Sequence, residues 1–389
     1  MAEADKGLAG VIEVYDDRSR RARELRSQGS KVVGYLCIYP VLEMLTALDI
    51  VPYRIFGEMR EPVTEADAYM PAVNCPFLKS CLDLGLKGRY DFLDGIVTSH
   101  ICDVGSTLSS IWNYAVRTPF SHHIDTPHTV HETALAQEKG LLEDYRKALE
   151  EFTGERLTDE KLRAAIGLHN EQRALVREFY ELKKQSPPLV SGAETIQVVK
   201  ALQSLPVDEA NRLLREVITE VTERKDGPAA RPARLLVWGS VIDDTAMLDM
   251  IESLDANVVM DDTCVGIRPF ADDVELTDDP LDGLAYHYLA DIRCPRTFRS
   301  NDFNAVKKDY AKDLEARFAY LEEYIRDWHA DGVILQSVRY CDTHGYDVPG
   351  LRDYLDNIGV PSIYIEHDYT EGALTPLKTR VQGFLEIIG

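Results

Sequence analysis

Short apolar runs alternate with helical spacing in the first third of the chain. Runs rich in β-branched and aromatic residues occur at 32–39, 51–56 and 92–99, and each has the length of a buried strand. Residues 42–49 lie between the first two runs and repeat apolar side chains every three or four positions, as an amphipathic helix does. Strands that alternate with helices along a chain predict βαβ units and a parallel sheet.

A long helical region follows this alternation. Two tetrapeptides, Thr129-Val-His-Glu132 and Ser191-Gly-Ala-Glu194, have the form of a capping box, which predicts a helix start at each. Between them, apolar residues recur at three- and four-residue spacing with charged outer faces. Residues 185–192, QSPPLVSG, interrupt that pattern with two prolines and a glycine. We therefore predict an N-terminal α/β domain with a helical extension over residues 1–190 and a C-terminal α/β domain over residues 191–389.

The second domain repeats the alternation of the first. A final helix is predicted from Thr375-Pro376, where an N-cap residue precedes a proline at the first helical position. Helical stretches separate four further runs that have strand character, at 234–240, 256–262, 332–338 and 361–368. The predicted fold class is α/β, with two Rossmann- or flavodoxin-like domains whose parallel sheets are joined by a helical segment.

The two halves share a dipeptide at corresponding places. Cys102-Asp103 follows one predicted strand and Cys341-Asp342 follows another, so both halves place Cys-Asp after a strand. In open parallel sheets, binding sites form outside the carboxyl ends of the strands, and a thiolate there can also interact with the N-terminus of the next helix. Chance recurrence of a dipeptide remains the alternative in a chain with 66 acidic residues.

Charge narrows the choice of partners. The 389 residues include 43 basic and 66 acidic side chains, which gives a formal charge of −23. An acidic surface of this kind repels phosphate backbones and anionic bilayers, so nucleic acid and membranes are not expected as partners, and an anionic ligand needs a local binding site. No apolar run approaches the roughly 20 residues that span a bilayer, and the first residues have no targeting signal, so we expect a cytoplasmic protein.

The seven cysteines are the main candidates for chemistry. Their odd number and wide spacing favour thiols or metal ligands over a disulfide framework. Cys75, Cys102 and Cys341 occupy loops or strand ends, and three such thiolates can hold an iron–sulfur cluster, although three unrelated thiols are the alternative. A zinc site at the four histidines of residues 122–131 is disfavoured, because no HExxH or CxxC pair accompanies them. The remaining cysteines are interpreted as structural or incidental: Cys37 (inside a predicted strand), Cys81, Cys264 and Cys294.

Several blocks of sequence together resemble a known family. These blocks are PVLEMLTALDIVPYRIFG, CPFLKSC, DFLDGIVTSHICD, LEEFTGERLTDEKLRAAIGLHNEQRALVREFYELKK, SVRYCD and GVPSIYIEHDYTEGALTPLKTRVQGFLE. They occur in order over nearly the whole chain from about residue 30, and the chain is similar to the iron–sulfur subunits of the 2-hydroxyacyl-CoA dehydratase and benzoyl-CoA reductase family.

The resemblance implies a metal centre and a set of site residues. In this family, two α/β domains surround a [4Fe-4S] cluster that three cysteines hold, and the matching positions here are Cys75, Cys102 and Cys341. Cys81 departs from the family pattern and is the alternative to Cys75 as first ligand. Glu43 matches an acidic position near the substrate and is the candidate for proton transfer, with a carboxylate that caps or pairs at a helix start as the alternative. For Arg54, an ordinary surface ion pair is the favoured interpretation, and a contact with the coenzyme A phosphates is the alternative.

The resemblance also implies partners and a reaction. The expected partners are a homologous iron–sulfur subunit, an ATP-binding iron–sulfur activator, reduced ferredoxin as donor and an aromatic acyl-CoA substrate. ATP is expected only through a partner subunit, because the chain lacks GxxxxGK[ST] and GxGxxG motifs. The blocks favour a subunit of an ATP-dependent benzoyl-CoA reductase. The alternatives are a subunit of an (R)-2-hydroxyacyl-CoA dehydratase that uses one-electron ketyl chemistry, and an electron-relay subunit that binds no substrate.

Overall fold

The protein is built on two parallel β-sheets. The computed structural model describes residues 6–388 and contains two four-stranded sheets with the strand orders β2-β1-β3-β4 and β6-β5-β7-β8. All pairings are parallel, and the two orders are the same once the numbering is shifted by four, so the chain repeats one topology. The strands are β1 (Val32–Tyr35), β2 (Val51–Arg54), β3 (Gly95–Ser99), β4 (Phe120–Ile124), β5 (Ala233–Gly239), β6 (Ala256–Asp262), β7 (Gly332–Val338) and β8 (Ser362–His367). The predicted α/β class with two such sheets is confirmed.

One strand was absent from the sequence prediction. β4 pairs with β3 at the edge of the first sheet, and its sequence FSHHI contains His122 and His123. Of its five residues only Ile124 is buried, so β4 lacks the apolar run by which the other strands, including the edge strands β2, β6 and β8, were recognised. The histidine-rich segment is therefore partly a strand.

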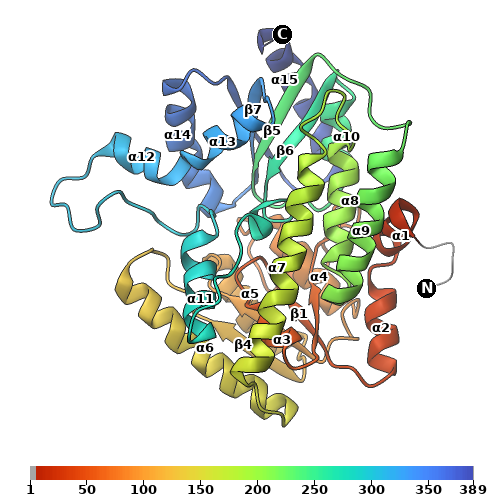
Figure 1. Ribbon diagram of the computed structural model, residues 1–389, viewed down its shortest axis with the longest axis vertical. Helices are drawn as coiled ribbons and strands as arrows, with labels where there is room; N and C mark the ends of the chain where they lie inside the picture. The colour runs from red at the N-terminus through yellow and green to blue at the C-terminus, as the bar shows by residue number, and fades with distance from the viewer. Residues whose placement is uncertain (1–5, 389) are drawn as a thin grey trace.

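Helices surround and connect the sheets. In Figure 1, α7, α8 and α9 run side by side from the first sheet toward the second, and α7 contacts α3 while α8 contacts β6. The α-helices are α1 (Gly7–Asp16), α2 (Ser19–Ser27), α3 (Leu42–Thr46), α4 (Pro76–Leu86), α5 (Asp103–Ala115), α6 (Glu132–Thr153), α7 (Asp159–Glu181), α8 (Gly192–Leu202), α9 (Val207–Glu223), α10 (Ala246–Glu252), α11 (Pro280–Tyr286), α12 (Tyr310–Phe318), α13 (Tyr320–Asp327), α14 (Asp342–Asn357) and α15 (Leu374–Ile388). Four short helical turns complete the structure: η1 (Ala66–Ala68), η2 (Arg268–Phe270), η3 (His287–Asp291) and η4 (Glu371–Ala373).

Three predicted helix starts have different outcomes. The capping box at Ser191 is confirmed, since its hydroxyl accepts from the Glu194 amide at 3.0 Å and the Glu194 carboxylate accepts from the Ser191 amide at 2.8 Å. The box at Thr129 is wrong, because His131 is the N-cap of α6 and accepts from the Thr133 amide. The last helix starts at Leu374, one residue before the predicted N-cap, because the turn η4 leads directly into it.

The apolar core extends across both halves. One cluster of buried side chains contains residues of both sheets, among them Ile96 of β3 and Val237 of β5. Burial of a core this size is the main stabilising contribution to such a fold. Within residues 6–388, no helix combines the length and apolar character that crossing a membrane requires. The shared core fixes the carboxyl ends of the two sets of strands relative to each other.

A cysteine-lined candidate active site

A cavity lies at the carboxyl ends of strands from both sheets. Its walls come from segments that follow β1, β3, β5 and β7, together with the N-terminus of α4. Parallel strands end with their free carbonyl edge and the following loops at one side of the sheet, where ligand sites in α/β folds form. The repeated topology thus brings two such edges to one cavity.

The three predicted thiols line this cavity together. Cys75, Cys102 and Cys341 are the N-cap residues of α4, α5 and α14. The sulfur of Cys102 also accepts a hydrogen bond from the Gly105 amide at 3.3 Å. The positive end of a helix dipole favours an anionic ligand at each of these positions. The sequence separation of these residues is large, yet the fold places all three thiols around one space.

Burial keeps these thiols protonated when they are free. It raises the pKa of Cys75 to about 12 and of Cys102 to about 11, and it raises the pKa of Cys341 as well. The negative charge of Cys102 adds to the rise at Cys75, and that of Cys75 adds to the rise at Cys341, so the three groups interact electrostatically. A metal that binds here displaces the protons and neutralises this repulsion.

Three further cysteines line the same cavity, contrary to the expectation that they are incidental. They are Cys37, Cys264 and Cys294. The strand β1 ends at Tyr35, so Cys37 lies in the loop beyond it and not inside the predicted strand. Cys264 follows β6 by two residues, and its position after a strand was a signal that sequence reasoning could have used. Cys81 is buried within α4 and is not among the residues that line the cavity.

Buried guanidinium groups surround the thiols. Arg54 and Arg296 line the cavity with 3% and 5% of their surface exposed. Arg54 donates to the Gln203 side chain and Arg296 to backbone carbonyls, and among residues 6–388 neither forms an ion pair with a carboxylate. The expected surface ion pair at Arg54 is therefore wrong. A buried cation without a counter-ion is costly, so these two groups favour an anionic occupant.

A third buried arginine contacts one thiol of the cavity directly and is linked to a second through a histidine. Arg268 pairs with Asp262 (Nε to Oδ1, 2.9 Å) and donates to Cys264 Sγ at 3.7 Å and to His344 Nε2 at 3.1 Å. Because a guanidinium only donates, Nε2 of His344 accepts and the ring proton lies on Nδ1, 3.4 Å from Cys341 Sγ. Burial first, and then the charge of Arg268, keeps the pKa of His344 well below its usual range, so the ring is neutral.

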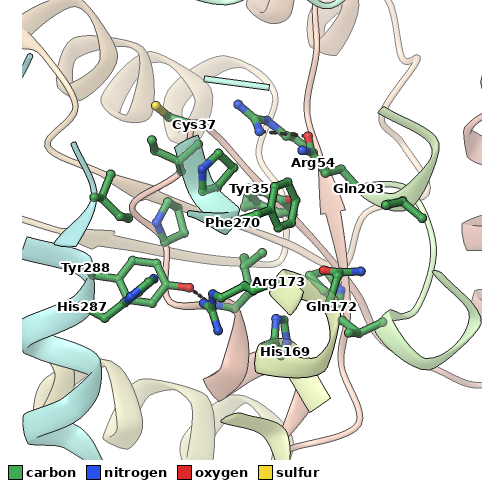
Figure 2. Close-up of a pocket in the computed structure, with 18 of the residues that line it drawn as sticks. Tyr35, Cys37, Arg54, His169, Gln172, Arg173, Gln203, Phe270, His287 and Tyr288 are labelled. Atoms are coloured by element: carbon green, nitrogen blue, oxygen red, sulfur yellow. Dashed lines mark hydrogen bonds between the residues drawn. The ribbon is translucent and has the colours of Figure 1, made fainter. Parts of the chain in front are cut away.

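Glu43 is fully buried in an ion pair beside a second pocket. Its carboxylate accepts from Arg173 (2.6 Å) and from the Tyr288 hydroxyl (2.7 Å). Burial alone would raise the pKa of Glu43, but the charge of Arg173 and these hydrogen bonds lower it to about 2, so the group is a carboxylate. Figure 2 shows Arg173 and Tyr288 together on the wall of this pocket, with His169 beside them.

The second pocket adjoins the cysteine cavity. Cys37 and Arg54 line both spaces, and Figure 2 shows the two side chains on the far side of the pocket from Tyr288. The remaining wall is largely apolar and aromatic and includes Tyr35 and Phe270. An organic group that enters this pocket would come to lie next to the thiols.

The residues of the cysteine cavity fit a thiolate-bound group. Within residues 6–388, no group of three or more His, Cys, Asp or Glu side chains is arranged to hold one metal ion. In a [4Fe-4S] cluster each thiolate binds a different iron, so the thiols surround the cluster and do not converge on one point. Thiols at three helix N-termini, with unpaired buried cations around them, fit an anionic thiolate-bound group of this kind.

Comparison with known proteins gives a consistent set of relatives. Residues 37–388 match the family described as 2-hydroxyglutaryl-CoA dehydratase, D-component. One benzoyl-CoA reductase subunit from Thauera aromatica is 26% identical over 363 residues, which cover 92% of this chain and 91% of that protein. The (R)-phenyllactyl-CoA dehydratase beta subunit of Clostridium sporogenes is 24% identical and covers 100% of both chains. The lactoyl-CoA dehydratase subunit beta of Anaerotignum propionicum is 25% identical over 92% of each chain.

Proposed function

The chain belongs to the 2-hydroxyglutaryl-CoA dehydratase D-component family and is an enzyme subunit of the acyl-CoA dehydratase and reductase type, and from this premise we propose its cofactor and reaction. Cys75, Cys102 and Cys341 hold a [4Fe-4S] cluster in the cysteine cavity. The subunit takes part in the ATP-dependent reduction of benzoyl-CoA to a cyclohexadienoyl-CoA. The observation that carries the proposal is that these three cysteines, 239 positions apart between Cys102 and Cys341, line one cavity at helix N-termini.

The residues around the cavity have distinct tasks in this proposal. When bound, the cluster supplies electrons of low potential. The chain's own groups hold and tune it: His344 donates toward Cys341 Sγ, and the buried charges of Arg54 and Arg296 stabilise negative charge in the cavity. Hydrogen bonds to ligand sulfurs, nearby charge and exclusion of water all set the potential of such a site.

The adjoining pocket is proposed to take the acyl group of the thioester. Its apolar and aromatic wall suits an aromatic ring, and its shared residues Cys37 and Arg54 bring that ring beside the cavity. Glu43 is kept as the candidate for proton transfer. Reduction of the ring adds protons to it, so the group that would pass a proton to the ring is the Tyr288 hydroxyl, which lines the pocket. The ionised Glu43 carboxylate accepts a hydrogen bond from this hydroxyl and would hold it in place for that transfer.

The proposal includes partners that this chain does not replace. The relatives are named as subunits, which supports assembly with a second subunit. We propose that this second subunit is a homologous iron–sulfur protein, and that an ATP-binding iron–sulfur activator, itself reduced by ferredoxin, delivers the electrons. This division of labour is consistent with the lack of a phosphate-binding glycine-rich motif in the chain.

An assay with two substrates tests the reaction. The complex, purified without oxygen and supplied with ATP and a reductant, is offered benzoyl-CoA and a 2-hydroxyacyl-CoA in parallel. We expect turnover of benzoyl-CoA. Turnover of the 2-hydroxyacyl-CoA alone would overturn the reductase assignment in favour of the dehydratase, the second candidate, which the similarity to two dehydratase beta subunits supports.

The electron-relay alternative makes a separate prediction. If the subunit binds no thioester, a photoreactive benzoyl-CoA analogue will not label the pocket that Tyr35 and Phe270 line. We expect labelled peptides from this pocket, in amounts that excess benzoyl-CoA reduces. Labelling confined to the partner subunit would refute the substrate-binding role of this chain.

A further inference from the structure

Six of the seven cysteines of the chain line one cavity, which is more than one four-iron cluster uses. A [4Fe-4S] cluster has one ligand position per iron and therefore takes at most four thiolates. Cys75, Cys102 and Cys341 account for three of the six. At least two of the remaining set, Cys37, Cys264 and Cys294, are then left without a partner iron, although they share the same space.

The second set of thiols occupies loops, as ligands do. Cys37 lies just beyond β1 with φ at 66°, in the left-handed region that a non-glycine residue adopts only at a conformational cost. Cys264 follows β6, and Cys294 lies in a turn in which its amide donates to Ile292 at 2.9 Å. Buried cysteines that serve only as small apolar groups have no need of such positions.

The six thiols come in equal number from the two halves of the chain. The first half of the chain contributes Cys37, Cys75 and Cys102, and the second half contributes Cys264, Cys294 and Cys341. Both halves carry the same strand order, and Cys102 and Cys341 follow the corresponding strands β3 and β7. The cavity is therefore built jointly by the two halves of the chain.

Buried arginines lie close to thiols of both sets, the first being Cys75, Cys102 and Cys341 and the second Cys37, Cys264 and Cys294. Arg268 donates to Cys264 Sγ and, through His344, reaches Cys341, so one buried cation connects a thiol of each set. Arg54 lines the cavity near Cys37, while Arg296 is held by three backbone carbonyls at 2.6 Å. Three buried guanidinium groups, of which only Arg268 has a carboxylate partner among residues 6–388, favour an occupant with considerable negative charge.

We propose that Cys37, Cys264 and Cys294 are iron ligands too, and that the six thiolates together hold an iron–sulfur assembly with more iron than a single [4Fe-4S] cluster. The inference deepens the proposed function and rests on it in so far as both place iron in the cysteine cavity. Each thiol loses its proton as its sulfur binds iron, and the sulfur is not oxidised. The buried arginines compensate the added negative charge.

The test is the amount of iron and acid-labile sulfide bound to the full chain. The protein is produced with ample iron and purified without oxygen, and native mass spectrometry gives the mass of the inorganic assembly on the wild-type chain. We expect more than four iron atoms per chain. Cys37→Ser, Cys264→Ser and Cys294→Ser should each lower the iron content by up to about half. Cys81→Ser is the matched control, because that cysteine does not line the cavity, and it should leave iron unchanged.

The outcomes separate the inference from the proposed function. A wild-type chain with one to four iron atoms would overturn the inference and leave the proposed cluster standing, whatever the three serine variants retain. A chain that binds no iron would overturn both. Mass spectrometry of the wild-type chain decides the matter even where circular dichroism shows that a variant is unfolded.

Discussion

The chemistry of a cysteine in this protein depends on its position relative to a helix. Cys75, Cys102 and Cys341 are each the N-cap residue of a helix, whereas Cys81 lies within one. A helix start leaves amide groups without intrahelical partners, and these can donate to a sulfur, as the Gly105 amide does to Cys102. The interior position offers no such donors, so burial there gives an ordinary apolar cysteine.

The proposed ligand set predicts iron content residue by residue. Replacement of Cys75, Cys102 or Cys341 by alanine should reduce bound iron and bleach the broad visible absorbance of the anaerobically purified protein, because each removes one of the three thiolates. Iron analysis and absorbance spectra of the three variants check this expectation. If all three variants retain full iron, the assignment is refuted; Cys81→Ala serves as the control that keeps its iron.

Substitution of Glu43 tests whether this carboxylate serves stability, catalysis or both. Glu43→Gln leaves Arg173 buried without its counter-ion and should cost about 3–5 kcal/mol in the free energy of unfolding. The double variant Glu43→Gln/Arg173→Met removes both charges and should recover much of that loss. Urea denaturation measures the stability of each variant. Turnover should be lost in both variants if Glu43 takes part in proton transfer, and normal turnover in the double variant would leave the carboxylate with a structural role alone.

At the scale of elements, the capped start of α8 stabilises the junction between the two halves of the chain. The start of α8 uses a capping box, and Arg224 also pairs with Glu194 at 2.6 Å, so this junction between the halves is fixed at three points. We expect Ser191→Ala to lower the free energy of unfolding by about 1 kcal/mol. Denaturant titration checks the value, with Ser110→Ala on the exposed side of α5 as the matched substitution. Equal stability of the two variants would contradict the role of the cap.

A carboxyl group on α6 makes the stability of the protein depend on pH. Glu138 is fully buried, Thr126 donates to it at 3.3 Å, and burial raises its pKa from 4.5 to about 7. The folded protein therefore binds a proton that the unfolded chain releases, and stability falls as pH rises from about 4.5 to about 7. Unfolding measured at the two ends of this range should show the fall, by roughly 1–3 kcal/mol, in the wild type. Glu138→Gln should show less of it, and an identical pH dependence would exclude this carboxyl as the source.

At the scale of the whole molecule, local patterns predict the two sheets but not how they meet. Apolar runs marked seven of the eight strands, and only β4, in which Ile124 alone is buried, lacked that signal. The resemblance to a family predicted that Cys75, Cys102 and Cys341 lie close together. Nothing in the spacing of Cys37, Cys264 and Cys294 indicates their convergence, since it depends on two sheets packed through a shared core. The pairing of Glu43 with Arg173, 130 positions away, is equally a product of packing.

That convergence predicts a coupling between the halves of the chain. Because the proposed ligands come from α4 and α5 in the first half and α14 in the second, bound iron connects segments that are far apart in sequence. A ligand that binds only the folded state stabilises the elements that hold it. Removal of iron by an anaerobic chelator should therefore increase amide hydrogen exchange at the N-termini of all three helices together, while the remote helix α2 stays unchanged. Faster exchange in α4 and α5 with no change in α14 would mean that the first half holds the metal alone, and the proposed site between the two sheets would be wrong.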